Sequence, residues 1–463
     1  MIATASVARL IGLCAILSLA LGVAAPDGWA QVAPPGQLQA PGPIRKDVTP
    51  EDEPVTQRQP LLLRLPSLGP TLAPDYPGLS SYPLEFLQLL MRPLEPRDLN
   101  LLPTFAISEG FSDNIFLNNN NKQYDFITSF TPGVMGLVNR PRFQLAAGFS
   151  NEAEIFARGT NPNDAFARQN LVIASIWEPT PTMTVTVADT FLRDQSPNAT
   201  VGGFSILGQG GETNVFNPTF GWRIEPETRL DLGAAYSIVR FEGTGAGIAS
   251  DTYTFNSNLT HAFTPRLSGM VGYNLTYIDF RTGHVDNATA NNPTIGLSYR
   301  LTPTLSVGFD GGPVFTHLGN EDFVTPGISA GFAQQFSFGT LSAYYSRSVG
   351  VAGGFGGPTD NQSVSATMVL PTWRDWVVIF NPAWTQSESL SSKQIERVDV
   401  DLFTISIGAA YRVNPYIMVF GGYHFLLQRV GRFSTTTGTF DADENRFRFG
   451  VQFGYPFGFD LGG

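Results

Sequence analysis

Hydrophobic and polar residues alternate along short stretches of this chain. In residues 297–309, apolar side chains occupy every second position on both sides of a Thr-Pro-Thr tripeptide. Successive residues of a β-strand point to opposite faces, so this pattern predicts two strands, each with one apolar face, joined by a tight turn. The same alternation is clear in residues 252–263, 401–413 and 446–455. We therefore expect an all-β fold.

One unit recurs from residue 99 onward: a polar residue, a proline, one to three further residues, and then an alternating apolar run. Regular copies occupy residues 178–187, 223–236, 262–273, 300–309 and 412–423, and looser ones occupy 137–149, 336–345 and 370–380. Longer polar joints lie between these turns, among them the Gly-Asn-Glu-Asp of residues 319–322. Eight short turns and nine loops would separate about 18 strands, with 16 as the alternative.

The alternation of short turns with longer loops favours one architecture. A β-sandwich has no reason to place every short turn at the same end, and a propeller is suggested only by the repeat length near 40 residues. Outer-membrane barrels do have short turns at the periplasmic end, longer loops outside and an even number of strands. We predict a transmembrane, up-and-down antiparallel β-barrel over residues 98–463.

The amino-acid composition favours a sheet whose two faces meet different surroundings, water on one side and lipid on the other. Charged residues make up 14% of the chain and aromatic residues 12%. The polar faces of the predicted strands carry Ser, Thr, Asn and Gly in place of the Lys and Glu of a soluble sheet, which favours a hydrated lumen inside and lipid outside. The net charge of −11 argues against nucleic acid as a partner.

The first 97 residues differ from the rest. Residues 1–30 combine Arg9, an apolar run and small residues before Gln31, a pattern that predicts a secretory signal peptide. The only cysteine, Cys14, lies inside it. Residues 31–97 are rich in proline, which favours extended backbone without a core, with a short helix predicted in residues 83–96. This periplasmic segment is a linker, a tether to a partner, or a plug in the pore.

Several arginines are candidates for the pore. Arg223, Arg300 and Arg412 each lie beside an aromatic residue close to a predicted short turn, on the polar face. They would surround the periplasmic mouth, either as a weak filter for anionic solutes or as local partners of carboxylates. Arg446 and Arg448 fall on the lumen face of the last long strand.

Three stretches resemble known proteins. They are the opening strand in residues 101–117, the phrases YRLTP and YRVNP, and the closing RFGVQFGY. The last is similar to the assembly signal of Gram-negative outer-membrane barrels, with Arg448, Gly450, Phe453 and Tyr455 in its positions, although this chain continues through residues 456–463. Residues 99–463 resemble the β-barrel porin 2 family and related barrels of exopolysaccharide loci. The resemblance implies a channel, the outer-membrane barrel assembly machinery as a partner, a polysaccharide export system as a further one, and no catalytic residues.

We therefore expect a passive outer-membrane pore for polar solutes or exopolysaccharide, with no cofactor, metal or catalytic residue. Two alternatives remain: a structural or docking barrel with a filled lumen, and an outer-membrane hydrolase. The hydrolase would use His284 or His317, each near acidic residues of predicted outer loops. The acidic clusters in residues 396–401 and 441–444 lack the spacing of an EF-hand.

Overall fold

The structure of the protein is a computed structural model. It describes residues 98–196, 210–242, 248–281, 285–351, 357–373, 375–390, 399–431 and 441–459. The predicted signal peptide, Pro-rich segment and short helix lie outside these residues, as does His284.

The described residues form long β-strands separated by turns and loops. The strands are β1 (Leu99–Ser112), β2 (Asp125–Arg140), β3 (Phe143–Phe156), β4 (Asp164–Thr180), β5 (Met183–Asp194), β6 (Gly211–Glu225), β7 (Thr228–Phe241), β8 (Ser250–Ala262), β9 (Leu267–Phe280), β10 (Ala288–Thr302), β11 (Leu305–Leu318), β12 (Glu321–Phe336), β13 (Gly339–Val351), β14 (Pro358–Trp373), β15 (Trp376–Ser389), β16 (Asp399–Asn414), β17 (Ile417–Gly431), β18 (Ala442–Gly454) and the short β19 (Phe457–Phe459).

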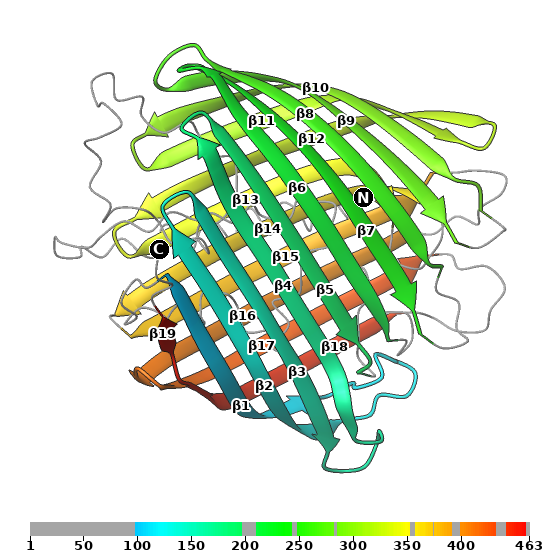
Figure 1. Cartoon of the computed structure of the whole chain (residues 1–463). Helices are drawn as coiled ribbons and strands as arrows, with labels where there is room; N and C mark the ends of the chain where they lie inside the picture. The colour runs from blue at the N-terminus through cyan, green and yellow to red at the C-terminus, as the bar shows by residue number, and fades with distance from the viewer. Residues whose placement is uncertain are drawn as a thin grey trace. The chain divides into compact units, whose positions relative to one another are not determined.

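The sheet closes on itself. Each strand from β1 to β17 pairs antiparallel with the next, and β18 returns to β1, where Phe105 lies opposite Phe453 and Gly110 opposite Arg448. The result is an 18-strand barrel, as predicted from the turn spacing (Figure 1). Closure pairs the backbone of every strand on both sides, so no sheet edge is left open.

Short and long connections lie at opposite ends of the barrel, which we call the short-turn end and the long-loop end. The eight short turns contain two to four residues each, in the places that the recurring unit indicated.

One prediction about the loops was wrong: only Gly319 and Asn320 connect β11 to β12, because both strands continue through the predicted loop. Gly319 has a φ of 57°, a left-handed conformation that glycine adopts without strain and that permits this tight turn.

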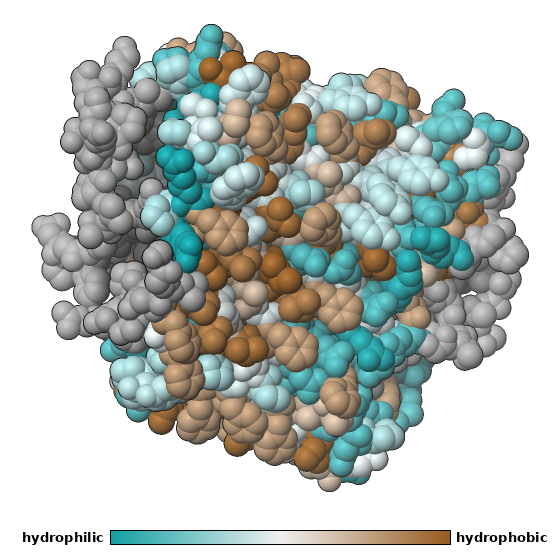
Figure 2. Space-filling view, in the orientation of Figure 1, coloured by the Kyte–Doolittle hydropathy of each residue, from teal (hydrophilic) through white to brown (hydrophobic). Residues whose placement is uncertain are grey.

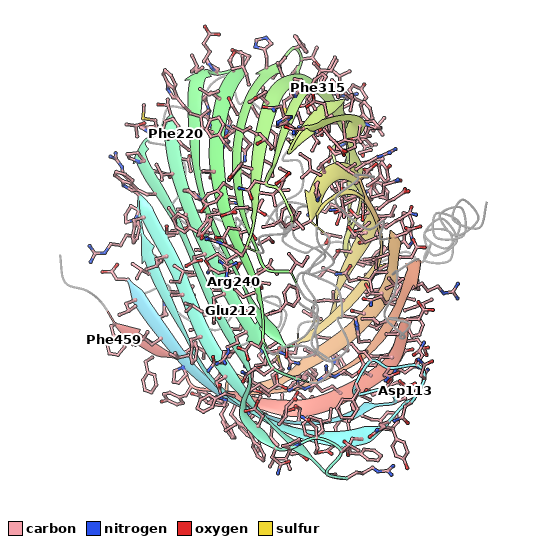
Figure 3. All side chains as sticks on the ribbon, turned by 90° about the vertical axis from the view of Figure 1, so that its right-hand side faces the viewer. Asp113, Glu212, Phe220, Arg240, Phe315 and Phe459 are labelled. Carbon is pink, nitrogen blue, oxygen red and sulfur yellow. The ribbon has the colours of Figure 1, made fainter. Side chains whose placement is uncertain are left out.

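The two faces of the wall differ as the alternation predicted. Along β18, Phe447, Phe449 and Phe453 are exposed on the outer face, whereas Arg448 and Gln452 are buried on the inner one. Hydrophobic side chains cover much of the outer surface, and side chains project from both faces of the sheet (Figures 2 and 3). The most exposed of these hydrophobic residues include Ile295 at 71% and Val324 at 67%, so the outer face is built for an apolar surrounding.

Within the described residues, no helix is long and apolar enough to cross a membrane.

Candidate pore wall

A network of ion pairs lies on the inner wall, in the half toward the long-loop end. At its centre is Arg168 of β4, with 4% of its surface exposed. Its Nη1 lies 3.2 Å from Glu152 Oε2 and 3.6 Å from Glu154 Oε1, and its Nε lies 2.9 Å from Asp194 Oδ2. Its Nη2 donates to Ser196 Oγ at 3.1 Å. One guanidinium thus joins β3, β4 and the end of β5.

The same carboxylates also bind arginines from the last long strand. Arg448 Nη2 of β18 lies 2.9 Å from Glu152 Oε1, and Arg446 Nη2 lies 3.7 Å from Glu154 Oε1. Arg448 Nε also donates to Ser108 Oγ of β1 at 2.8 Å. Between β18 and β3 stand two strands, a distance of about 14 Å along the wall at the usual strand spacing. The long side chains therefore meet over the inner surface of β1 and β2, across the line where the sheet closes.

We call this set the seam network. It contains three arginines and three carboxylates, whose charges cancel: Arg168, Arg446, Arg448, Glu152, Glu154 and Asp194. Glu152 and Glu154 are 2% and 1% exposed. Charges removed from water are tolerated when each is paired, and losing one member leaves an uncompensated buried charge. The network thus ties the first and last strands together, and its arginines are paired with carboxylates.

The three arginines predicted for the mouth lie at the short-turn end. Arg223, Arg300 and Arg412 each stand two residues before the end of β6, β10 and β16, so they are spread around the barrel. Arg412 Nε donates to Asp375 Oδ1 of the adjacent turn at 3.0 Å, which is the local pairing that was the alternative to a filter. Arg223 is exposed and Arg300 half-buried. Arg446 and Arg448 lie away from this mouth, in the seam network.

The residues of the predicted assembly signal occupy the closing strand. Arg448 is part of the seam network, Gly450 packs closely against β1, and Phe453 and Tyr455 are exposed on the outer face at 43% and 55%. The Tyr455 ring stacks on Tyr416 with centroids 5.3 Å apart. The chain beyond this signal, which departs from the usual pattern, forms β19 and pairs with Leu99–Leu101 of β1.

The described histidines do not assemble a hydrolytic site. His261 is exposed on the outer face, where its Nδ1 lies 2.9 Å from Thr228 Oγ1. His424 is buried on the inner wall with Nδ1 2.9 Å from Ser406 Oγ. His317 Nδ1 lies 2.7 Å from Asp322 Oδ1, but the two side chains are 61% and 83% exposed. A solvated pair of this kind at a strand end gives no sheltered pocket for substrate. The described residues also contain no cluster of three metal-ligating side chains.

Sequence reasoning missed most of the seam network. Glu152 and Glu154 stand two apart in the stretch Asn-Glu-Ala-Glu-Ile-Phe, with Phe149 and Ile155 on the opposite face. That spacing could have placed both carboxylates on the inner wall. Nothing in the sequence pairs them with arginines some three hundred residues away.

No protein-family model matches the chain, and no curated protein matches it in sequence. Among solved structures it is similar to OccAB3 from Acinetobacter baumannii, at 12% identity and a TM-score of 0.40, over 78% of this chain and 100% of that one. OpdK, an outer membrane protein of Pseudomonas aeruginosa, has 11% identity and a TM-score of 0.40, over 78% and 99%. The FrpB iron transporter of Neisseria meningitidis has 9% identity and a TM-score of 0.41, over 79% and 83%. Such likenesses assign no family and no activity to the chain.

Proposed function

We propose that this protein is an outer-membrane β-barrel of a Gram-negative bacterium and acts as a passive pore for polar solutes. The observation that carries the proposal is the exposed apolar outer face around a closed sheet whose inner face holds the polar and charged side chains. A bilayer core accepts only spanning structures whose backbone groups are satisfied internally, and a closed barrel meets that condition. Eighteen strands are also enough to enclose an aqueous channel.

The proposed orientation follows from where the barrel begins and ends. Leu99 of β1 lies opposite Phe459 of β19, so both ends of the barrel lie at the short-turn end. In outer-membrane barrels the short turns face the periplasm. Residues 31–97 would then be periplasmic, and the closing strand would be presented to the barrel assembly machinery as the sequence resemblance implies.

Selectivity in this proposal comes from the mouth. The carboxylates and arginines of the seam network neutralise one another, so they provide little net field for a passing ion. Arg412 is offset by Asp375. Arg223, which is exposed at this mouth, is the residue that sets a weak preference for anions, whether the solute is a small polar nutrient or an extended exopolysaccharide.

The test is conductance of the purified, refolded full chain in planar bilayers. We expect discrete current steps and, in a salt gradient, a reversal potential that shows a modest anion preference. Replacing Arg223→Gln should shift the reversal potential toward cations. Replacing Arg412→Gln should shift it less, because the charge of Arg412 is already countered by Asp375. A folded protein that never passes current would contradict the pore.

A structural or docking barrel with a filled lumen is the second candidate. One observation favours it: part of the inner wall at the short-turn end is apolar, unlike the wall of a channel lined throughout by water. The exposed position of His317 gives no comparable support to a hydrolase.

A further inference from the structure

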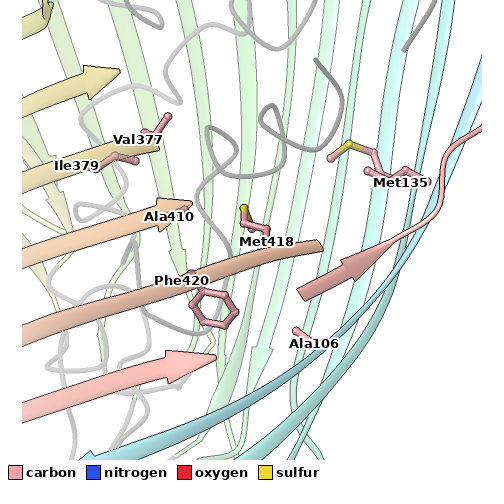
Figure 4. Packing of buried hydrophobic residues seen from close by; sticks show 8 residues of the cluster. Ala106, Met135, Val377, Ile379, Ala410, Met418 and Phe420 are labelled. Atoms are coloured by element: carbon pink, nitrogen blue, oxygen red, sulfur yellow. The ribbon is translucent and has the colours of Figure 1, made fainter. Parts of the chain in front are cut away.

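An apolar patch covers part of the inner wall at the short-turn end (Figure 4). We call it the inner patch, and it consists of Leu102, Ala106, Met135, Val377, Ile379, Ala410, Met418 and Phe420. These residues come from β1, β2, β15, β16 and β17, which lie on both sides of the closing strand β18. All are buried, with exposed fractions between 0% and 8%.

The inner patch is not typical of the rest of the wall at this end. Asn256 and Asn258 of β8 point to the inner face, where they lie beside Gly233 of β7 and Gly272 of β9. Ser268 of β9 continues this polar surface. Burial of apolar surface is favourable, and these side chains of the inner patch are at most 8% exposed although they lie on the wall of a lumen, so the area suits a bound apolar segment. The patch therefore has the character of a docking surface.

A buried amide lies in the same area. Gln452 of β18 is 1% exposed, and its Cα lies opposite Ala106 on one side and Met418 on the other. Neither Nε2 nor Oε1 has a hydrogen-bond partner among the described residues. An unpaired buried amide is unfavourable, so a ligand that offers a donor and an acceptor is favoured here. A polypeptide backbone offers both.

We propose that residues 84–97 of this same chain fold back into the barrel and bind the inner patch, with Gln452 pairing to their backbone. The chain enters the wall at Leu99, only three residues before Leu102 of the patch. Residues 84–91 read Leu-Glu-Phe-Leu-Gln-Leu-Leu-Met, the most apolar run close to that point. Pro93 and Pro96 follow, and because proline has no backbone N–H it disfavours regular backbone pairing, which leaves carbonyl groups of this stretch available to the Gln452 donor.

Residues 84–97 are long enough to reach the inner patch. Fourteen residues of extended chain span up to about 45 Å, whereas the eight residues from Leu99 to Ala106 of β1 cover about 27 Å of the wall. The segment can therefore turn at the mouth and pass along the patch. This inference rests on the proposed pore, because it places the segment along the wall of the channel that the proposed function requires and leaves the rest of the lumen open.

Engineered cysteines test the docking in the full chain. Residues 31–463 contain no cysteine, so every disulfide formed is the designed one. A cysteine placed in turn at Leu84, Phe86, Leu87 and Leu90 is combined with Ala410→Cys on the patch. The matched control is Ala409→Cys, the neighbouring alanine on the outer face of the same strand. We expect at least one position to form a disulfide with Ala410→Cys at least tenfold faster than with Ala409→Cys, read as altered gel mobility without reductant.

Equal rates at the inner and outer positions, or no disulfide with either, would overturn the docking. Met418→Cys with Val419→Cys as its outer control repeats the comparison if an Ala410 variant does not fold, with folding checked by resistance of the barrel to detergent before heating. The two measurements distinguish failure of the docking proposal from failure of the proposed pore. Cross-linking at the patch without any current in bilayers contradicts the pore, whereas current without a preference for the patch contradicts the docking.

Discussion

At the scale of single residues, the seam network is the part of the wall where charge matters most. Arg168 holds three carboxylates, and two of them are shared with Arg446 and Arg448 from the other side of the closure. In the intact protein each of the six groups has an oppositely charged neighbour within 4 Å. The importance of the network appears when one partner is removed.

Replacing Arg168→Met should lower the free energy of unfolding by about 3–5 kcal/mol, because Glu152, Glu154 and Asp194 would lose their central cation. Urea unfolding in lipid vesicles, followed by tryptophan fluorescence, measures the change. Arg193→Met is the control, since Arg193 pairs with Glu242 where both side chains are about one third exposed, and such a pair contributes less than about 1 kcal/mol. Equal losses in both variants would contradict a special role for the network.

At the scale of elements, β18 shows how a strand is fitted to its neighbour. A Cβ on Gly450 would lie 2.5 Å from the carbonyl oxygen of Ile107 and 2.6 Å from the Phe420 ring. Both contacts are closer than any real Cβ contact, so β1 and β17 can approach β18 only because residue 450 has no side chain. The glycine of the predicted assembly signal thus also has a packing role.

Replacing Gly450→Ala should destabilise the barrel by about 1–3 kcal/mol through overpacking, or force the closing strands apart. Gly421→Ala on β17 is the matched control, since its Cβ would lie 3.6 Å or more from its neighbours. Refolding into vesicles that lack assembly proteins separates packing from recognition of the signal. If both variants refold with equal stability, the close approach at Gly450 has no energetic consequence.

Turns were the best-predicted elements and loops the least. The recurring unit located all eight short turns, seven of them through a proline and the turn after β12 without one, because turn residues and the return of the apolar face are both local signals. The Gly-Asn-Glu-Asp stretch was predicted as a longer loop since its residues are polar. Strands that extend beyond the apolar region can carry polar residues on both faces, and Glu321 is the first residue of β12.

At the scale of the whole molecule, the closed wall divides an apolar outside from an inside that holds the charges. If the outside meets lipid, the cost of a charge must depend on which face carries it. Two positions three residues apart on the same strand, one on each face, provide that comparison.

Replacing Ile295→Arg on the outer face of β10 should cost about 2–4 kcal/mol in a bilayer, the range for an arginine deep in the hydrocarbon. Ser298→Arg on the inner face of the same strand should cost less, because its charge remains near the lumen. Unfolding of both variants in vesicles checks the difference. Similar costs on the two faces would argue against a membrane around this barrel.

The sequence by itself determined the strands, the faces they present and the positions of the short turns, since each depends on residues close together in the chain. It also indicated that the number of strands was near eighteen. Only the tertiary structure decided which distant side chains meet. The pairing of Arg448 with Glu152 and the inner patch around Gln452 both exist because the last strands return to the first. Closure is a contact between the two ends of the barrel, and no local pattern specifies what it brings together.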